Sequence, residues 1–357
     1  MINTGTSFKD RFNQQQLRHI YSEYDTHAVS LALVIVSVLC IPFGVTIIVA
    51  SDSIREVTFR YDNLNSYTYV EGPEGTYPVT FEFDGKKYST GAIARLDFSL
   101  KKTMSAPIMV QYGLKNFNQN YLKYVKSLDH NQLQGGRNAI ISSCNPLRYP
   151  GELRNESVDG YYSPCGAIAW SLFNDTISIY KTPKDLICDG GAFDERGTSL
   201  LESNKCIKKG VALRSEVKIR HNTPNNTNNA GPMWTAKGNK SSSNPFLRHG
   251  YYFGEAGHKI PWITDEDFVV WSNVAYLPDF YNNYRILKSD LKAGDYYFEI
   301  IEQYDVASFS GQKYVKLLSY NWLGQKQYIL GIFLLFVGCI LFVDSVAVLV
   351  SRYFIHK

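Results

Sequence analysis

Two apolar stretches decide the fold: AVSLALVIVSVLCIPFGVTIIVA at residues 28–50 and YILGIFLLFVGCILFVDSVAVLV at residues 328–350. Each has 23 residues. As a helix with about 1.5 Å rise per residue, each reaches roughly 34 Å. The hydrocarbon core of a bilayer is about 30 Å thick, so both are long enough to cross it with some tilt. The first has no charged residue and the second has one, Asp344. We therefore expect two transmembrane helices.

Residues 51–327, between these stretches, are polar enough to form a water-soluble domain. The stretch at 28–50 is too long for the hydrophobic region of a signal peptide and lacks a small-residue cleavage site, so we expect it to stay as an anchor. The expected organisation is a tail, a helix, a large domain, a helix and a tail, at residues 1–27, 28–50, 51–327, 328–350 and 351–357.

The orientation follows from glycosylation sequons rather than from basic residues. Five Lys and Arg residues lie in the tails and five lie near the spans on the other side, so the positive-inside rule does not decide. The domain contains four sequons and the tails contain none; their asparagines are Asn155, Asn174, Asn225 and Asn239. We therefore expect a lumenal or extracellular, glycosylated domain, with both termini cytosolic.

The six cysteines divide into two groups. Cys40 and Cys339 lie inside the apolar stretches, where we expect them to pack as apolar residues. The large domain contains the other four, Cys144, Cys165, Cys188 and Cys206. Four cysteines allow three pairings, and we favour Cys144–Cys165 and Cys188–Cys206 because each closes a short loop. A four-cysteine zinc site is the alternative, but spacings of 21, 23 and 18 lack a CxxC pair, and an oxidising compartment explains the even number better.

Alternating apolar and polar residues predict a mainly antiparallel, sandwich-like β domain. The predicted strands lie at residues 57–61, 79–83, 108–112, 211–219, 296–301 and 314–318. Because the domain begins and ends at the membrane, we expect its first and last strands to be neighbours.

Two segments of the domain do not fit a strand pattern. Residues 117–128 have apolar side chains at helical spacing, which predicts a short helix. Residues 221–248 are rich in Asn, Ser, Thr, Gly and Pro, and we expect them to form a long exposed insertion.

The sequence contains no signature of catalysis. It has no GxxxxGK[ST], HExxH, GxSxG or CxxC motif. Four histidines of the domain are scattered, at His130, His221, His249 and His258. The acidic cluster Asp265-Glu266-Asp267 could form a carboxylate pair or a cation site, but we favour a solvated turn or a helix start after Thr264. We expect no catalytic residue, cofactor, metal or nucleic-acid partner.

Small residues recur every seven positions in both apolar stretches. Ser30, Ser37, Gly44 and Ser51 in the first, and Gly331, Gly338 and Ser345 in the second, each fall on one helix face. Small side chains let helix backbones approach closely in lipid, so we expect these faces to pack against a partner or against each other. Leu335 is expected to face lipid. Asp344 is expected either to reach the cytosolic headgroups or to meet a polar group on a partner.

Several short blocks, in order along nearly the whole chain, resemble the accessory (beta) subunits of type IV P-type ATPases, the lipid flippases, called the cell cycle control protein fifty or ligand-effect modulator family. The most distinctive block is Pro164-Cys-Gly-Ala-Ile-Ala-Trp-Ser-Leu-Phe-Asn-Asp-Thr176. The others are Phe12–Leu17, Asn116–Asn120, Tyr124–Ser127, Gln132-Leu133, Ile260–Asp265, Phe268–Trp271, Leu277–Phe280, Phe309–Lys313 and Asn321–Lys326.

Three features depart from this family. The chain has no cysteine pair before Cys144, no proline-containing segment between Leu17 and Thr26, and an unfamiliar acid at Asp344. These departures concern individual contacts rather than the resemblance as a whole.

The resemblance implies a non-catalytic, chaperone-like subunit that forms a heterodimer with the catalytic ATPase. Such a subunit supports export of the ATPase from the endoplasmic reticulum and its movement of membrane lipids. The complex is expected in the endoplasmic reticulum, Golgi and endosomes, or plasma membrane. ATP chemistry belongs to the partner, and this chain has no Asp-Lys-Thr-Gly motif.

Two other classes of protein remain as alternatives. A two-span ion channel with a large ectodomain would have the same topology, but such ectodomains usually contain many more than four cysteines. A membrane-anchored lumenal enzyme, such as a glycosidase, would need paired carboxylates in a cleft.

Overall fold

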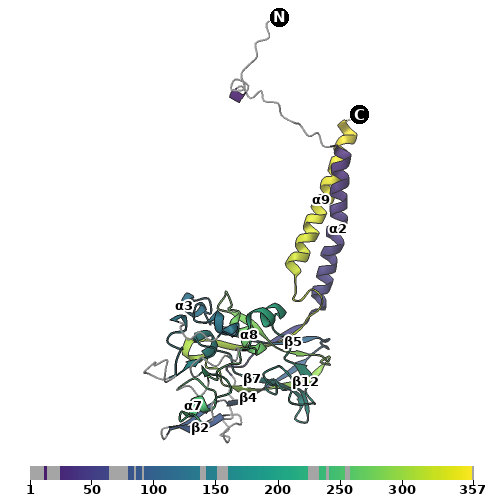
Figure 1. Cartoon of the computed structure of the whole chain (residues 1–357). Helices are drawn as coiled ribbons and strands as arrows, with labels where there is room; N and C mark the ends of the chain where they lie inside the picture. The colour runs from purple at the N-terminus through teal and green to yellow at the C-terminus, as the bar shows by residue number, and fades with distance from the viewer. Residues whose placement is uncertain are drawn as a thin grey trace. The chain divides into compact units, whose positions relative to one another are not determined.

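The computed structural model describes residues 12–13, 25–63, 79–83, 86–90, 92–136, 142–150, 160–223, 233–238, 241–253 and 258–355. It forms two compact units (Figure 1). The first contains residues 1–53 and 323–357, and the second contains residues 54–322.

The first unit is an antiparallel pair of long helices, α2 (Thr26–Ser53) and α9 (Tyr328–Ile355). Both are long and apolar enough to cross a membrane. They extend a few residues beyond the apolar stretches seen in the sequence. The larger apolar side chains point away from the partner helix, among them Leu31, Phe43, Ile332 and Phe336. This outward apolar surface is what a helix pair in lipid requires.

The second unit contains a five-stranded antiparallel sheet. Its strand order is β1 (Glu56–Arg60), β13 (Gln312–Ser319), β5 (Ile108–Lys115), β11 (Phe280–Leu287) and β9 (Cys206–Ile207). The expectation that the first and last strands are neighbours is confirmed, because β1 pairs with β13 from Glu56 opposite Leu318 to Arg60 opposite Tyr314.

A four-stranded antiparallel sheet forms the second layer. Its order is β4 (Ala92–Leu100), β12 (Gly294–Glu302), β7 (Thr176–Thr182) and β8 (Asp185–Cys188). Two smaller pairs are the hairpin of β2 (Val79–Phe83) with β3 (Lys86–Thr90) and the parallel pair of β6 (Tyr161–Tyr162) with β10 (Met233–Trp234). The predicted mainly antiparallel β domain is confirmed.

The two large sheets share one core, which is rich in aromatic side chains. Phe59 of β1 lies 5.1 Å from Phe98 of β4 and 6.0 Å from Phe298 of β12, measured between ring centroids. On β12, Phe298 and Ile300 point inward, while Tyr297 points outward and carries the guanidinium of Arg95 at 4.0 Å. Strand alternation thus divides each strand between core and surface.

Short helices fill the connections between strands. They are α3 (Leu122–Val125), α4 (His130–Leu133), α6 (Ala167–Trp170), α7 (Pro245–Arg248) and α8 (Glu266–Ser272), with the 3₁₀ turns η1 (Ser142–Cys144) and η3 (Ala307–Phe309) and the π-helical turn η2 (Glu216–Arg220). The largest, α8, is held by Trp271, which is fully buried and donates its indole N–H to the carbonyl of Ile168 at 2.9 Å.

The predicted helix at 117–128 is largely wrong, since only α3 is helical there. Asn116 ends β5 with a positive φ of 62°, and Phe117 packs on Trp271 with ring centroids 5.7 Å apart. Tyr121 and Leu122 remain exposed. The helical spacing therefore does not form one buried face.

The strand predicted at 211–219 is also wrong. Leu213 and Ile219 are exposed, and the chain forms η2 instead. Arg220 and Glu216 form an ion pair at 2.8 Å across this turn, and the His221 ring contacts the Glu216 carbonyl oxygen at 3.2 Å. These polar contacts along one turn require helical rather than extended backbone.

The expectation that 221–248 is an exposed insertion is wrong for several described residues. Phe246 and Leu247 on α7 are buried, and so is His221. Residues 224–232 and 239–240 lie outside the described part of the chain.

Candidate functional site

The small-residue stripe, defined as Ser30, Ser37, Gly44, Ser51, Gly331, Gly338 and Ser345, faces inward between α2 and α9. A Cβ added to Gly44 would lie 2.9 Å from the carbonyl oxygen of Gly331, and one added to Gly338 would lie 2.7 Å from Ile41. Ser30 and Ser345 hydrogen-bond through their hydroxyls at 2.8 Å. The two spans therefore pack on each other through the stripe.

The position of Leu335 differs from the sequence-based expectation. Its Cγ atom would lie 2.9 Å from a Cβ on Gly44, so this side chain packs at the helix interface rather than facing only lipid. Phe336, the next residue, is 64% exposed and faces away from α2. Asp344 also lies on the exposed side of α9, next to the buried Ser345.

We expect Gly338→Leu to push α2 and α9 apart. The new side chain would meet Ile41, and helix association in lipid depends on close fit. The expected result is at least a fivefold loss of crosslinking between cysteines placed at positions 30 and 345, in the full chain in membranes. Phe336→Leu, on the outer face, should leave the yield unchanged. Equal yields for both variants would contradict the packing of the stripe.

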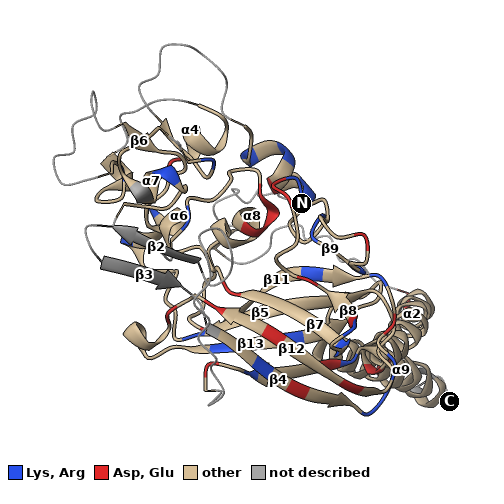
Figure 2. Ribbon diagram, turned by 90° about the horizontal axis from the view of Figure 1, so that it is seen from below, with Lys and Arg blue, Asp and Glu red and all other residues tan. Residues whose placement is uncertain are grey.

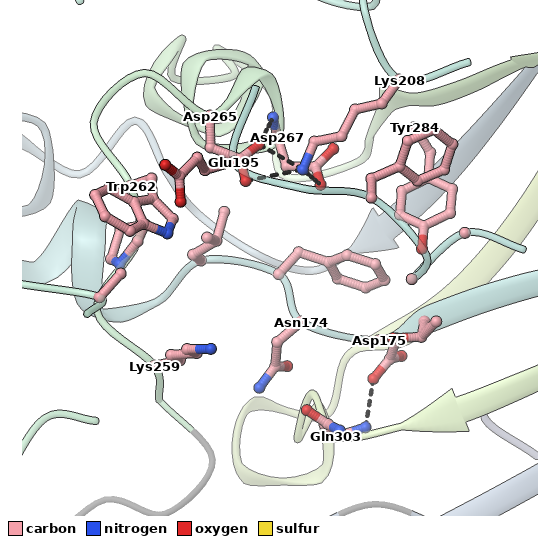
Figure 3. Close-up of a pocket in the computed structure, with 18 of the residues that line it drawn as sticks. Asn174, Asp175, Glu195, Lys208, Lys259, Trp262, Asp265, Asp267, Tyr284 and Gln303 are labelled. Atoms are coloured by element: carbon pink, nitrogen blue, oxygen red, sulfur yellow. Dashed lines mark hydrogen bonds and ion pairs between the residues drawn. The ribbon is translucent and has the colours of Figure 1, made fainter. Parts of the chain in front are cut away.

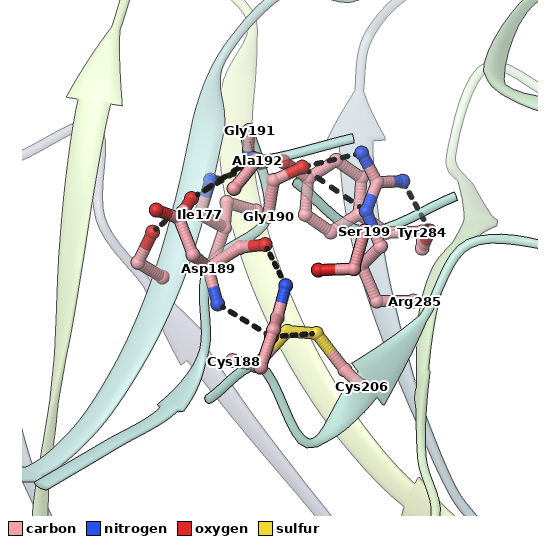
Figure 4. Close-up of a disulfide and its surroundings, with 12 residues drawn as sticks. Ile177, Cys188, Asp189, Gly190, Gly191, Ala192, Ser199, Cys206, Tyr284 and Arg285 are labelled. Carbon is pink, nitrogen blue, oxygen red and sulfur yellow. Dashed lines mark hydrogen bonds between the residues drawn. A yellow bond between two sulfur atoms is a disulfide. The ribbon is translucent and has the colours of Figure 1, made fainter. Parts of the chain in front are cut away.

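Two disulfides are present, Cys144–Cys165 and Cys188–Cys206, while Cys40 and Cys339 are free. These are the two local pairs favoured from the sequence. The second bond joins β8 of one sheet to β9 of the other (Figure 4). Beside it, the side chain of Asn204 accepts from the backbone N–H of Asp189 at 3.1 Å and donates to its carbonyl at 3.0 Å. The bridge therefore connects the two layers beside a hydrogen-bonded turn.

A buried ion cluster surrounds Asp175, which lies near the end of the distinctive block Pro164–Thr176. Its carboxylate accepts from the ammonium of Lys313 at 2.7 Å, the hydroxyl of Tyr61 at 2.8 Å and two backbone N–H groups. Glu302 is a second anion, 2.9 Å from the Lys313 ammonium. Burial disfavours the charged ammonium, but Asp175 and Glu302 together raise the pKa of Lys313. The cluster fixes the backbone that precedes β7.

A second cluster lies at the start of α8, where the acidic sequence at 265–267 is found. The prediction of a helix start is confirmed, since Asp265 caps the helix by accepting from the backbone N–H of Asp267 at 2.9 Å. The expectation of a solvated turn is wrong. Lys208 contacts Asp265 at 2.6 Å and Asp267 at 2.9 Å, and Arg285 contacts Asp267 at 2.7 Å. Lys208 and Arg285 are both buried.

The electrostatics of this cluster are those of a structural ion network. Burial alone would raise the pKa of Asp267, but Arg285 and Lys208 lower it to about 2. Burial and the neighbouring Asp267 raise the pKa of Asp265. Arg285 reaches the cluster from β11 at a register shift between Asn283 and Arg285. Figure 2 shows α8, with its red first turn, beside β11 with its blue segment. A β-bulge commonly re-aims a side chain in this way.

A cavity of about 290 Å³ opens beside this cluster. The sequon residue Asn174 lines it, together with Lys259, Trp262 and Gln303 (Figure 3). Asn174 is half-buried. The other sequon residues, Asn155, Asn225 and Asn239, lie outside the described residues.

The described histidines do not form a catalytic group with one another or with the carboxylates that line the cavity. His221 contacts the Ser272 hydroxyl at 3.1 Å, but both are buried and neither lines the cavity. His258 stacks on Trp170 with ring centroids 3.9 Å apart. Within the described ranges, no group of three or more His, Cys, Asp or Glu side chains could hold a metal ion.

One exposed apolar surface lies on the β domain. We call it the apolar loop surface and define it by Tyr121, Leu122, Val125, Tyr276 and Leu277, all of which are exposed. The side chain of Asn120 donates to the carbonyl of Tyr276 at 2.9 Å and holds the two loops together. Clustered exposed apolar residues of this kind commonly mark an interaction surface.

Two helices able to span a membrane, together with a disulfide-containing domain of antiparallel sheets, define a membrane-anchored protein with one large folded domain. The chain belongs to the LEM3 (ligand-effect modulator 3) family / CDC50 family, whose model matches residues 47–357. It is thus a membrane protein of a family of non-catalytic accessory subunits.

Three relatives illustrate the similarity. Cell cycle control protein 50A of Bos taurus is 31% identical over 96% of this chain and 88% of its own length. ALA-interacting subunit 3 of Arabidopsis thaliana is 31% identical over 94% of this chain and 83% of its length. The phospholipid-transporting ATPase accessory subunit CRF1 of Saccharomyces cerevisiae is 27% identical over 96% of this chain and 84% of its length.

Proposed function

We propose that this chain is the non-catalytic accessory subunit of a phospholipid-transporting P-type ATPase, with which it forms a heterodimer. The observation that carries the proposal is the family match, which covers both the β domain and the second span. In this role the chain supports folding of the ATPase, its exit from the endoplasmic reticulum and its lipid-translocation cycle.

The proposed topology places the tails 1–27 and 351–357 in the cytosol and the domain 51–327 in the lumen or outside the cell. The four sequons and the two disulfides support this orientation. The complex would reside in the endoplasmic reticulum, Golgi and endosomes, or the plasma membrane.

The contact with the ATPase is proposed to include the apolar loop surface. Its two loops are tied by a hydrogen bond, so the surface is pre-formed for a rigid partner. Since the small-residue stripe is used between α2 and α9, the spans would contact the ATPase through their outer faces instead.

Affinity purification of the full chain in mild detergent tests this function. We expect one large P-type ATPase in a 1:1 complex. A homotrimer would support the ion-channel alternative, and a monomer without partner would support a lumenal enzyme.

The same experiment tests the apolar loop surface. The double substitution Tyr276→Ser with Leu277→Ser should reduce recovery of the ATPase at least fivefold, because it removes exposed apolar contacts without touching the core. The matched control is Leu213→Ser with Ile219→Ser, which lie at 68% and 67% exposure elsewhere on the domain. Equal recovery for both pairs would show that this surface does not contact the ATPase.

A further inference from the structure

The cavity beside Asn174 differs from the surroundings of an ordinary glycosylation site. Sequons usually lie on exposed surface. Here the Asn174 side chain lines a cavity of about 290 Å³ instead. This volume is near the lower end of the roughly 300–1,000 Å³ seen for small-molecule sites, which suits one sugar ring better than a whole lipid.

The backbone at Asn174 is fixed in this position from both sides. The next residue, Asp175, is fully buried at the Lys313 ammonium and also accepts from the N–H groups of Gln303 and Tyr304, both at 2.6 Å. The preceding residue, Phe173, stacks on Tyr112 with ring centroids 3.8 Å apart. Asn174 cannot turn outward without disrupting these contacts. Any glycan attached to it must therefore begin inside the cavity.

The charged groups of the cavity wall are mostly neutralised by each other. Lys208 and Arg285 are paired with Asp265 and Asp267. The Asp194 carboxylate accepts from backbone N–H groups of its own turn. Lys259 is a further lining cation, and burial lowers its pKa. A phosphate would thus meet one ammonium rather than a cluster of free cations, while a neutral polar ligand can enter where its polar groups find hydrogen-bond partners.

The remaining lining residues offer what a neutral sugar needs. The Gln303 side-chain nitrogen is buried and has no hydrogen-bond partner within the described part of the chain. Figure 3 shows the Lys259 ammonium and the Gln303 side chain directed toward the Asn174 side chain. The Trp262 ring, half-buried, adds an apolar face. A buried donor without a partner is costly, and a sugar hydroxyl or acetamide oxygen would satisfy it.

We propose that this cavity holds the first N-acetylglucosamine of a glycan attached to Asn174, so that the protein binds its own modification as part of the fold. The sugar's apolar face would lie on Trp262, and its acetamide or hydroxyl groups would bond with Gln303 and Lys259. This inference rests on the proposed lumenal orientation but not on the ATPase partner.

The test is enzymatic removal of the glycans from the native full chain, made in a eukaryotic secretory host and purified in mild detergent. Peptide-N-glycosidase F cleaves the bond between asparagine and the first sugar, and peptide mass spectrometry in ¹⁸O-water measures the rate at each site. We expect release at Asn174 to be at least tenfold slower than at an exposed site, and equally fast after denaturation.

The exposed comparison site is supplied by Leu213→Asn, which creates a sequon with Arg214 and Ser215 where the native side chain is 68% exposed. Trp262→Ala in the same background should speed native release at Asn174 at least fivefold. Trp322→Ala, at a residue 72% exposed, should not change it. If Trp262→Ala does not fold, Lys259→Ala replaces it, because this variant also removes a side chain from the cavity wall and should also speed native release at Asn174.

Three results would overturn the proposal. The first is equal native release at Asn174 and at the exposed site. The second is an unmodified Asn174 in a chain glycosylated elsewhere, whereas a chain with no glycan at all would overturn the lumenal orientation as well. The third is a rise in melting temperature of the glycosylated chain on adding glycerophosphoserine, because that would show the cavity to be open to a lipid headgroup. Recovery of the ATPase by affinity purification is a separate measurement, so failure of the proposed function can be told apart from failure of this proposal.

Discussion

Lys313→Met is expected to lower the free energy of unfolding of the β domain by about 3–5 kcal/mol. Lys313 is 2% exposed, and its ammonium lies between the carboxylates of Asp175 and Glu302. Removing one partner of a buried ion pair leaves an uncompensated buried charge, which is the source of a penalty of this size. Here two carboxylates would lose their cation at the point where β1, β7 and β13 meet.

Thermal and denaturant unfolding of the full chain in detergent, followed by near-ultraviolet circular dichroism, measures this effect. The control is Lys205→Met, which removes an exposed ion pair with Asp185 at 3.3 Å and should cost less than about 1 kcal/mol. If Lys313→Met does not fold, the fraction of chain that leaves the endoplasmic reticulum gives the same ranking. Similar losses for both variants would contradict the role of the buried cluster.

Removal of the Cys188–Cys206 bridge is expected to have the next largest effect. The double substitution Cys188→Ser with Cys206→Ser opens a loop of 18 residues, for which loop-closure entropy predicts about 3 kcal/mol of lost stability. The bridge also joins the two sheets next to Gly190, whose carbonyl accepts from Arg285, and next to Lys208. We therefore expect the contacts of Lys208 and Arg285 with the acidic residues at the start of α8 to weaken when the bridge is removed.

Unfolding of the double variant and non-reducing peptide mapping of the wild-type chain measure this prediction. Cys339→Ala, at a free cysteine in α9, should leave unfolding of the β domain unchanged. Mapping should recover peptides joined at Cys188 and Cys206. A Cys144–Cys188 or Cys144–Cys206 linkage would contradict the structure.

Local patterns in the sequence, and the positions of the two spans, predicted part of the structure. The two spans were predicted because their apolar residues are continuous. The pairing of β1 with β13 was predicted because both ends of the domain adjoin a span. Burial of charge could not be predicted in this way. Lys208, which directly follows β9, and Arg285 of β11 are buried against Asp267, and the local sequence pattern does not indicate such partners.

The difference at Leu335 has another reason. Leu335 lies four residues after Gly331 and three before Gly338, so helical geometry places it on the face of the stripe, and the expectation that it faces lipid did not take this spacing into account. The cavity at Asn174 is lined by segments that are distant in sequence. The sequon therefore predicted the asparagine that carries a glycan but not the residues that surround it.

The pairing of β1 with β13 also sets the order of events while the chain is being made. About 250 residues separate Arg60 from Gln312, and β13 lies between β1 and β5 in the sheet. At roughly 5–20 residues per second, β1 waits between about 12 and 50 s for its partner. During that time β5 also lacks one neighbour, and Asp175 lacks the Lys313 ammonium. A chain that stops before residue 312 therefore has a sheet with two unpaired strand edges and a buried acid without its cation, so the β domain is completed only when the segment leading to the second span has been made.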